Sequence, residues 1–497
     1  MHCEVLFITT QKILIIGAGV GGLSTAIILA KLGFDVTVLE KNAQPGGLMR
    51  SYSRNGIDCA VGVHYLGSLD KGQILRTFFD YLGITTAIPV TRMGQNGIID
   101  RYIFDSSTGI QSPFDMPQGI DAYADNLSRA FPLEQHKIAK FVVPLHSAAK
   151  QLHGLEFLYA KDSGFSLSDQ FEPLGNILSE LQCSPELQSV ISIPSCWLGV
   201  PLDDCPAYYH NMALASYLSS SWRLNQKGSD MADAFGARLK QLGGKIITGE
   251  EICKINVQSR VVQGLQLKSG ENLKASIVIG AVHPKLVLQM LAQEDVKPSY
   301  RKRISNLKDT HGIFSAHVQI DATTHGEIPY NIFKVDTDKR SNVADLKYYQ
   351  IRESEKKDVN LLSILTSGKD ELWAAWEQTR SGRRGEEYRA AKEQHASTLI
   401  AEAEQLFGSF EGAKLLDAYT PLSIRDWVNS PGGSAYGVSR SSSQILATAL
   451  LNRTAVRGLY LAGQNVTAPG IIGSIMGSFS TVKLLLGPDE FNKMIHL

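Results

Sequence analysis

The chain has 497 residues, of which 43% are hydrophobic and 20% are charged. These values are typical of a globular protein with about two to four domain-sized units. The 49 lysines and arginines equal the 49 aspartates and glutamates in number, and this balance argues against a protein that coats nucleic acid. The six cysteines form no C-x-x-C pair, so we expect reduced thiols and no metal site.

The start of the chain lacks the basic segment and the long apolar core of a signal peptide. The sequence contains no run of about eighteen apolar residues, so it predicts no helix that spans a membrane. We therefore expect a cytoplasmic protein. Peripheral contact with a membrane surface stays open, because such contact needs only a modest apolar face.

The first organised element is predicted between Lys12 and Glu40. KILII is a short apolar run, as in a buried parallel strand. Small and apolar residues from Val20 to Phe34 indicate a helix, and the next apolar run predicts a second strand that ends on Glu40. Strand, helix and strand together predict the first unit of a nucleotide-binding sheet.

Four glycines lie in the turn between the first strand and the helix. Gly17, Gly19 and Gly22 have the spacing G-x-G-x-x-G, and Gly21 lies within it. Gly17 would allow the tight turn, Gly19 the approach of a pyrophosphate, and Gly22 the close packing of the helix. The free N–H groups at the start of the helix favour the phosphate charge.

Glu40 ends the second strand about twenty residues after the glycine turn, at the position where dinucleotide sites carry an acid. Its carboxylate can accept hydrogen bonds from both hydroxyls of an adenosine ribose. It would repel a 2′-phosphate, so NADP is not expected at this site.

A second glycine turn follows at residues 45–47, where Gly46 and Gly47 lie between Lys41 and Arg50. An NAD site has no need for this turn, whereas FAD is longer and its second phosphate and ribityl chain need further backbone contact. The turn resembles the glycine-glycine extension of FAD-dependent amine oxidases and phytoene desaturases. The resemblance implies FAD as the cofactor, with Arg50 facing a phosphate or the flavin edge.

Two later segments are expected to complete this domain. Residues 458–487 contain an apolar strand that ends in Gly463, a loop that leads to Gly470, and a helix rich in small residues. The start of that helix can face the N1/C2=O edge of a flavin, where negative charge collects on reduction. Residues 225–280 predict a helix and several strands, and the backbone near Ile252 is expected on the adenine side.

Four stretches that together span nearly the whole chain resemble one superfamily, that of phytoene desaturases, carotenoid isomerases and retinol saturases. The retinol saturase-like branch is the best match. The stretches are GAGVGG with the second glycine turn, GIDCAVGVHYLG, GVPLDDCPAYYHNMALASYL with NQKGSDMADAF, and TPLSIRDWVNSPGGSAYG with LAGQNVTAPGIIGSIMGS. The chain departs from the branch at Lys227, where a glycine is usual, and at Asn465, where an aspartate is usual.

The resemblance implies an α/β fold with a discontinuous Rossmann-like FAD-binding domain of the amine-oxidase (GR2) type. This domain would comprise residues 1–72, 225–295 and 415–497. An α+β cap domain for the substrate would comprise residues 73–224 and 296–414. The resemblance also places FAD contacts at a further set of residues, which are Gly62, Val63, Ile252, Gly463, Gln464, Gly470, Ile471 and Ile472.

His64 and Tyr65 are the first candidates for catalysis, because the resemblance places the stretch from Gly62 to Gly67 along the flavin ring. A hydride delivered to one alkene carbon must be matched by a proton at the other, and either side chain could donate it. His64 could instead only shape the flavin site. Tyr436 is a second candidate donor near the mouth of the pocket.

The leading hypothesis is an FAD-dependent oxidoreductase that saturates, desaturates or isomerises carbon–carbon bonds of a hydrophobic polyene. The first alternative is a flavoenzyme of natural-product biosynthesis that reduces or cyclises a soluble or carrier-bound polyene. An amine oxidase would need an aromatic cage beside the flavin, and the sequence shows no clear one. A further possibility is a protein in which FAD is purely structural.

The electron partner is left open by the sequence. There is no second complete G-x-G-x-x-G unit for NAD(P)H. Electrons are therefore expected to pass to or from a protein partner, a quinone, oxygen or free reduced flavin.

Overall fold

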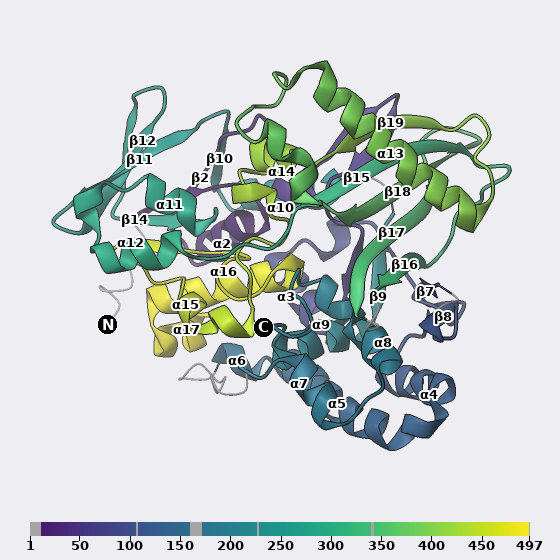
Figure 1. Cartoon of the computed structure of the whole chain (residues 1–497). Helices are drawn as coiled ribbons and strands as arrows, with labels where there is room; N and C mark the ends of the chain where they lie inside the picture. The colour runs from purple at the N-terminus through teal and green to yellow at the C-terminus, as the bar shows by residue number, and fades with distance from the viewer. Residues whose placement is uncertain (1–10, 106–107, 160–170, 226–227, 339–341, 497) are drawn as a thin grey trace.

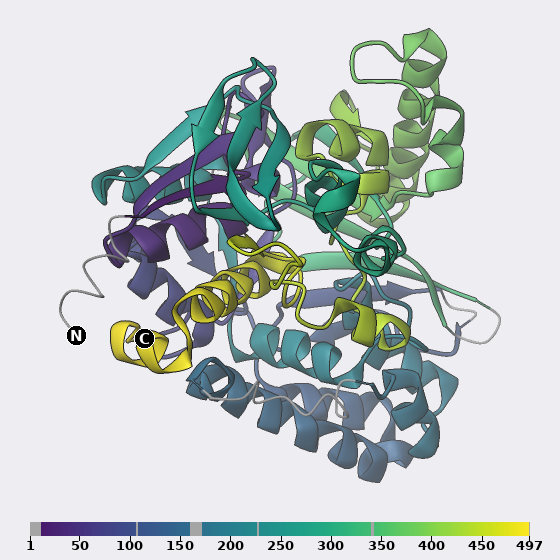
Figure 2. The same ribbon diagram turned by 90° about the vertical axis from the view of Figure 1, so that its left-hand side faces the viewer.

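The computed structural model describes residues 11–105, 108–159, 171–225, 228–338 and 342–496, and the elements below belong to these ranges. Lys227 lies outside them. Figures 1 and 2 show three regions, namely a parallel sheet with its helices, a large and mostly antiparallel sheet, and a separate group of helices below both. This arrangement confirms the predicted α/β fold with strands and helices in an additional region.

The parallel sheet is built from distant parts of the chain, as predicted. Its central strand, Lys12–Ile16, pairs in parallel with Asp35–Glu40 of the first predicted unit and with Ile277–Gly280 from the middle of the chain. Both faces are buried, which explains the continuous apolar runs. In pairing order the strands are β10 (Lys245–Thr248), β2 (Asp35–Glu40), β1 (Lys12–Ile16), β14 (Ile277–Gly280) and β20 (Leu459–Leu461).

Two helices, α2 (Val20–Lys31) and α16 (Gly470–Leu486), pack against each other on one face of this sheet. Glycines permit the contact, because a Cβ atom on Gly21 would overlap the backbone of Gly463, and one on Gly477 would overlap the Gly463 oxygen. The hydroxyl of Ser478 donates to the Gly21 oxygen at 2.9 Å. Since each helix follows a parallel strand, the contact places both helix starts at the same edge of the sheet.

A seven-stranded sheet forms most of the second region. Its outer face is covered by α13 (Gly385–Phe407), whose side chains share one apolar core with the sheet (Figure 1). The expected boundary between residues 414 and 415 falls inside β19, which pairs with β15 in this sheet. In pairing order the strands are β19 (Lys414–Tyr419), β15 (Ile313–Asp321), β18 (Val359–Ser367), β17 (Val343–Glu353), β16 (Asn331–Thr337), β7 (Asp100–Phe104) and β8 (Phe114–Met116).

Helices dominate the third region, where α5 and α9 pack along each other (Figure 2). Their apolar side chains fill a core shared with β7, β8 and β16. The helices are α4 (Ile120–Ala130), α5 (Gln135–Gly154), α6 (Glu156–Tyr159), α7 (Leu174–Glu180), α8 (Pro185–Cys196) and α9 (Ala207–Ser219). The helix before them, α3 (Ile74–Leu82), packs instead against α2 and α16.

Smaller elements connect these regions. A short sheet orders β5 (Tyr65–Gly67), β9 (Ser221–Leu224) and β6 (Val90–Arg92), and another orders β11 (Ile252–Gln258), β12 (Val261–Leu267) and β13 (Asn272–Lys274). The strands β3 (Ser51–Arg54) and β4 (Ile57–Ala60) form a hairpin. The remaining helices are α10 (Ser229–Gln241), α11 (Pro284–Gln289), α12 (Pro298–Ser305), α14 (Pro421–Val428), α15 (Ile445–Thr448) and α17 (Pro488–Met494).

Within the described ranges, no single helix combines the length and the apolar composition needed to cross a membrane. The pair α16 and α17 meets that criterion only when both are taken together, and they meet at an angle of 117°.

Replacing Gly477 with alanine tests the contact between α2 and α16. Helix propensity alone predicts that G477A stabilises the protein by up to about 1 kcal/mol. We expect the opposite, a loss of about 2 kcal/mol or more in the free energy of unfolding, because the new methyl group collides with the Gly463 backbone. Denaturant unfolding measures the change, with G326A as the control, since a methyl group there meets no described atom within 4 Å.

Candidate active site

The first glycine turn has the geometry predicted from its spacing. Gly17 adopts a φ of +97° and donates to the Leu39 oxygen at 2.8 Å, which turns the chain sharply after β1. A Cβ atom on Gly22 would overlap the Gly17 oxygen, so this glycine allows the close helix approach. A Cβ atom on Gly19 would meet no described atom within 4 Å. Open space therefore lies in front of the α2 start, where a pyrophosphate fits.

The second glycine turn extends this space. The Gly46 amide donates to the Ala18 oxygen at 2.7 Å, with Gly46 at a φ of +123°. A Cβ atom on Gly47 would lie 3.2 Å from the Gly19 Cα atom, so the two turns lie side by side. Two adjacent backbone cradles suit a dinucleotide with a second phosphate better than a mononucleotide. The residues present thus fit FAD.

Glu40 is 7% exposed and holds the first glycine turn and the chain just after β2. Its Oε2 atom accepts from the Ala18 amide at 2.9 Å, while Oε1 accepts from the amide and the side chain of Asn42 at 2.9 and 2.7 Å. A carboxylate offers about four acceptor positions, so about one remains open for a ribose hydroxyl. The Glu250 amide donates to the backbone oxygen of Glu40 at 3.0 Å. This bond brings the chain before Ile252 next to Glu40. The contacts to adenosine stay a prediction.

The end of α14 covers this part of the site, and sequence reasoning missed it. Lys41 Nζ donates to the Asp426 oxygen at 2.9 Å. Arg50 donates to the oxygens of Gly47 and Trp427, at 3.0 and 2.9 Å. The acceptors are backbone oxygens, so no residue type in the sequence signals them. Lys41 and Arg50 therefore lie next to the second glycine turn, at the place predicted for a phosphate.

The stretch predicted to face the flavin ring, Gly62 to Tyr65, is at least partly accessible to solvent. Gly62 is exposed and Val63, His64 and Tyr65 are partly exposed, although sheet and helices pack around them. Burial, together with the charge of Arg352, lowers the pKa of His64 to about 4. The imidazole is therefore neutral near pH 7, which argues against an imidazolium acid. Burial raises the pKa of Tyr65 well above its usual value, so this phenol keeps its proton.

An apolar cavity of about 700 Å³ lies beside this stretch and beside the start of α16. Tyr65, Gly470, Ile471 and Ile472 line it, so the structure brings these predicted residues together. Tyr436 is not among its lining residues, and its amide donates to the Thr310 hydroxyl at 3.1 Å. Most of the further lining residues are apolar or aromatic, and they include Leu66, Leu75, Leu152, Leu158, Trp197, Leu198, Tyr209, Met212, Leu450, Val466 and Met476.

A buried polar network adjoins Tyr65. Asp100 is fully buried, and its Oδ1 atom accepts from the Tyr217 hydroxyl at 2.7 Å and from Asn331 Nδ2 at 2.9 Å. Burial raises the pKa of Asp100 to about 7 although its hydrogen bonds lower it. The Tyr65 ring lies 5.3 Å from that of Tyr217 and 5.9 Å from that of Tyr348, measured between centroids. A carboxyl group able to exchange a proton near neutral pH thus lies close to Tyr65.

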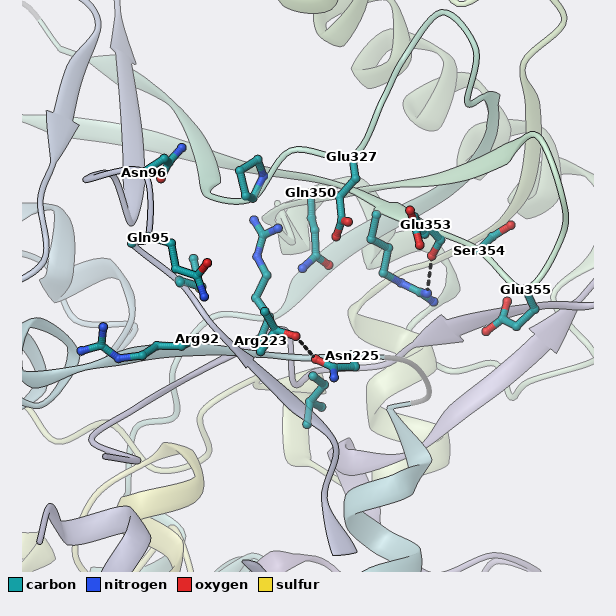
Figure 3. A pocket seen from close by; sticks show the side chains of 16 residues that line it. Arg92, Gln95, Asn96, Arg223, Asn225, Glu327, Gln350, Glu353, Ser354 and Glu355 are labelled. Atoms are coloured by element: carbon teal, nitrogen blue, oxygen red, sulfur yellow. Dashed lines mark hydrogen bonds between the residues drawn. The ribbon is translucent and has the colours of Figure 1, made fainter. Parts of the chain in front are cut away.

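A second cavity, of about 820 Å³, is polar. Figure 3 shows the side chains of Arg223, Gln350 and Glu327 converging on it. Arg223 is 7% exposed and donates to the Asn331 Oδ1 atom at 3.1 Å. This cavity therefore reaches the Asp100 network through Arg223 and Asn331. The described residues contain no cluster of side chains able to hold a metal ion.

Gly19→Val tests the cofactor cradle. The side chain would occupy the open space in front of α2 without meeting described atoms at Cβ. We expect G19V to fold with a melting temperature close to that of the apoprotein, and to lose FAD, measured as the flavin absorbance of the purified protein. Retention of stoichiometric FAD by G19V would show that the cofactor binds elsewhere.

Asp100→Asn tests the titration of the buried carboxyl. A folded-state pKa raised from 3.8 to about 7 means that the stability from this group is fully present below pH 3.8 and is lost as pH rises through 7. The difference in melting temperature between wild type and D100N should therefore shrink from pH 5 to pH 8. The exposed Asp233→Asn variant is the control and should show no such trend. A wild-type advantage over D100N that grows with pH would contradict the assignment.

Comparisons with known proteins agree with this geometry. The model of the family described as flavin containing amine oxidoreductase matches residues 20–478. All-trans-retinol 13,14-reductase of Rattus norvegicus is 24% identical, over 97% of this chain and 86% of its own length. A 4,4'-diapophytoene desaturase (4,4'-diapolycopene-forming) of Methylomonas sp is 25% identical, over 54% of this chain and 53% of its own length.

Solved structures share the fold. An oxidoreductase from Methanosarcina mazei superposes with a TM-score of 0.65 at 17% identity, covering 95% of this chain and all of its own. Wild-type putrescine oxidase bound to putrescine superposes with a TM-score of 0.63 at 15% identity, covering 96% of this chain and 99% of its own. The chain therefore belongs to the flavin-containing amine oxidoreductase family, with the phytoene desaturases and retinol saturases as relatives, and it is an FAD-dependent oxidoreductase.

Proposed function

We propose that the protein reduces a carbon–carbon double bond of a long hydrophobic polyene. The observation that carries the proposal is the apolar cavity of about 700 Å³, which brings Tyr65 and the start of α16 to one space. Cavities of about 300–1,000 Å³ hold ligands of this kind. The retinol 13,14-reductases match 97% of the chain and the desaturase 54%, which favours reduction over desaturation.

An amine substrate suits this cavity less well. The charged side chains that line it, Arg440 and Lys483, are both positive, and none of its described lining residues is acidic. A substrate ammonium would therefore be repelled and would find no carboxylate partner. A neutral or anionic chain carries no such penalty.

FAD, when bound, supplies hydride chemistry, and this chain's residues have to orient the substrate and provide a proton. Tyr65 is proposed as the donor, from its Oη atom to the alkene carbon opposite the hydride. The apolar wall, including Trp197 and Ile471, orients the polyene and excludes water. Asp100 and Tyr217 would return the proton to Tyr65, with the polar cavity behind Arg223 as the source from solvent.

A single-turnover experiment tests the reaction. Holoprotein reduced with dithionite is mixed anaerobically with all-trans-retinol, and flavin absorbance and product mass are followed. We expect flavin reoxidation together with a product that has gained two hydrogens. A product of unchanged mass with a shifted double bond would overturn the proposed reduction, as would reoxidation with no new product.

Tyr65→Phe removes the proposed donor in the same assay. General acid catalysis contributes about 10²- to 10⁴-fold, so we expect the rate of product formation to fall by that factor. Tyr209→Phe is the matched control, because it removes another phenol that lines the cavity, and its rate should stay within a few-fold of wild type. Equal rates for Y65F and wild type would remove Tyr65 from this role.

A further inference from the structure

Arg440 places a positive charge in the wall of the apolar cavity. It is 5% exposed and lines the cavity near Thr448 and Val466. Its Nη1 atom donates to the Thr448 oxygen at 3.2 Å, and its Nη2 atom donates to the Asn465 oxygen. These bonds fix the guanidinium between α15 and the loop that leads to α16.

No acid balances this charge among the described residues. None of the described residues lining the cavity is an aspartate or a glutamate, and no described carboxylate forms an ion pair with Arg440. Its Nε atom is buried without a hydrogen-bond partner in the described chain. Burial lowers the pKa of Arg440, which reflects the cost of holding a guanidinium away from water. A buried charge without an opposite charge beside it is destabilising, so we expect a bound partner for Arg440.

The polar cavity shows what a balanced site looks like in this protein. There Arg92, Arg223 and Arg352 share the wall with three glutamates, which are labelled in Figure 3 as Glu327, Glu353 and Glu355. The second cation of the apolar cavity, Lys483, already donates to the Leu158 oxygen at 2.9 Å. Arg440 is therefore the buried, fixed cation of this cavity, and its guanidinium still has N–H donors beyond those given to backbone oxygens.

We propose that Arg440 binds a carboxylate on the substrate, so that the substrate class is a polyene carboxylic acid. A guanidinium has five N–H donors; backbone oxygens take two of those on Arg440 and its Nε atom is buried, which leaves one on each Nη atom for an anion. A carboxylate matches such a planar group better than a hydroxyl or an ester does. The apolar chain then lies along the cavity toward Tyr65 and Ile471. This inference rests on the proposed function, whose substrate it narrows.

Ligand binding to the oxidised holoprotein tests the proposal without turnover. The probes are all-trans-retinoic acid, its methyl ester and all-trans-retinol, and the readout is quenching of tryptophan fluorescence, since Trp197 lines the cavity. We expect wild type to bind the acid about 10- to 100-fold more tightly than the ester, the range of a charge-assisted hydrogen bond. Arg440→Met should abolish this preference and leave ester binding within a few-fold. The methyl ester also represents a carrier-bound chain, so equal binding of acid and ester would overturn the proposal.

Controls separate recognition from packing. Arg301→Met is matched, because Arg301 also donates to backbone oxygens and has a buried Nε without a described partner, yet it does not line the cavity. R301M should keep the preference for the acid. Should R440M fail to fold, Arg440→Lys retains the charge and should keep part of that preference. A loss of acid, ester and retinol binding in equal measure in R440M would assign Arg440 a structural role and overturn the proposal.

The two proposals fail separately. Retinol reduction by an enzyme that binds acid and ester alike would leave the proposed function standing without the carboxylate site. A strong, Arg440-dependent preference for the acid, without reduction of any polyene, would support the site and contradict the proposed reaction.

Discussion

The contact between α2 and α16 is the constraint on which the site depends. Three glycines, Gly21, Gly463 and Gly477, let segments more than four hundred residues apart in the sequence meet without side chains between them. This brings two helix starts to one edge of the parallel sheet, and each start offers free N–H groups to a negative charge. One start faces the space beside Gly19, and the other lines the apolar cavity. An extended cofactor can therefore place its phosphates at α2 and its reactive ring at α16.

Burial then gives the surroundings of Tyr65 two kinds of chemistry. The apolar cavity offers a long substrate a space with little water and has Arg440 as a fixed charge in its wall. Next to Tyr65, the side chains of Asp100, Tyr217 and Asn331 form a buried network that reaches the polar cavity through Arg223. A low-dielectric substrate space beside a protonatable network is what a coupled hydride and proton transfer needs.

The nucleotide-binding half of the site could be predicted from sequence because its signals are local. Gly17, Gly19 and Gly22 lie in one turn, Glu40 ends the next strand, and the turn geometry follows from their spacing. The polar network could not be predicted in this way, since Asp100, Tyr217 and Asn331 come from β7, α9 and β16 and meet only through tertiary packing. The sequence around Arg440, GVSRSSS, contains nothing that indicates burial. The contacts of Asp426 and Trp427 use backbone oxygens, which every residue type carries.

A crystal structure of the holoprotein tests the central claim most directly. The account predicts that the pyrophosphate of FAD lies on Gly19 and Gly47, and that the isoalloxazine ring lies between the His64–Tyr65 stretch and the start of α16, at the wall of the apolar cavity. An isoalloxazine ring found in the polar cavity beside Arg223, or a pyrophosphate away from the two glycine turns, would contradict it.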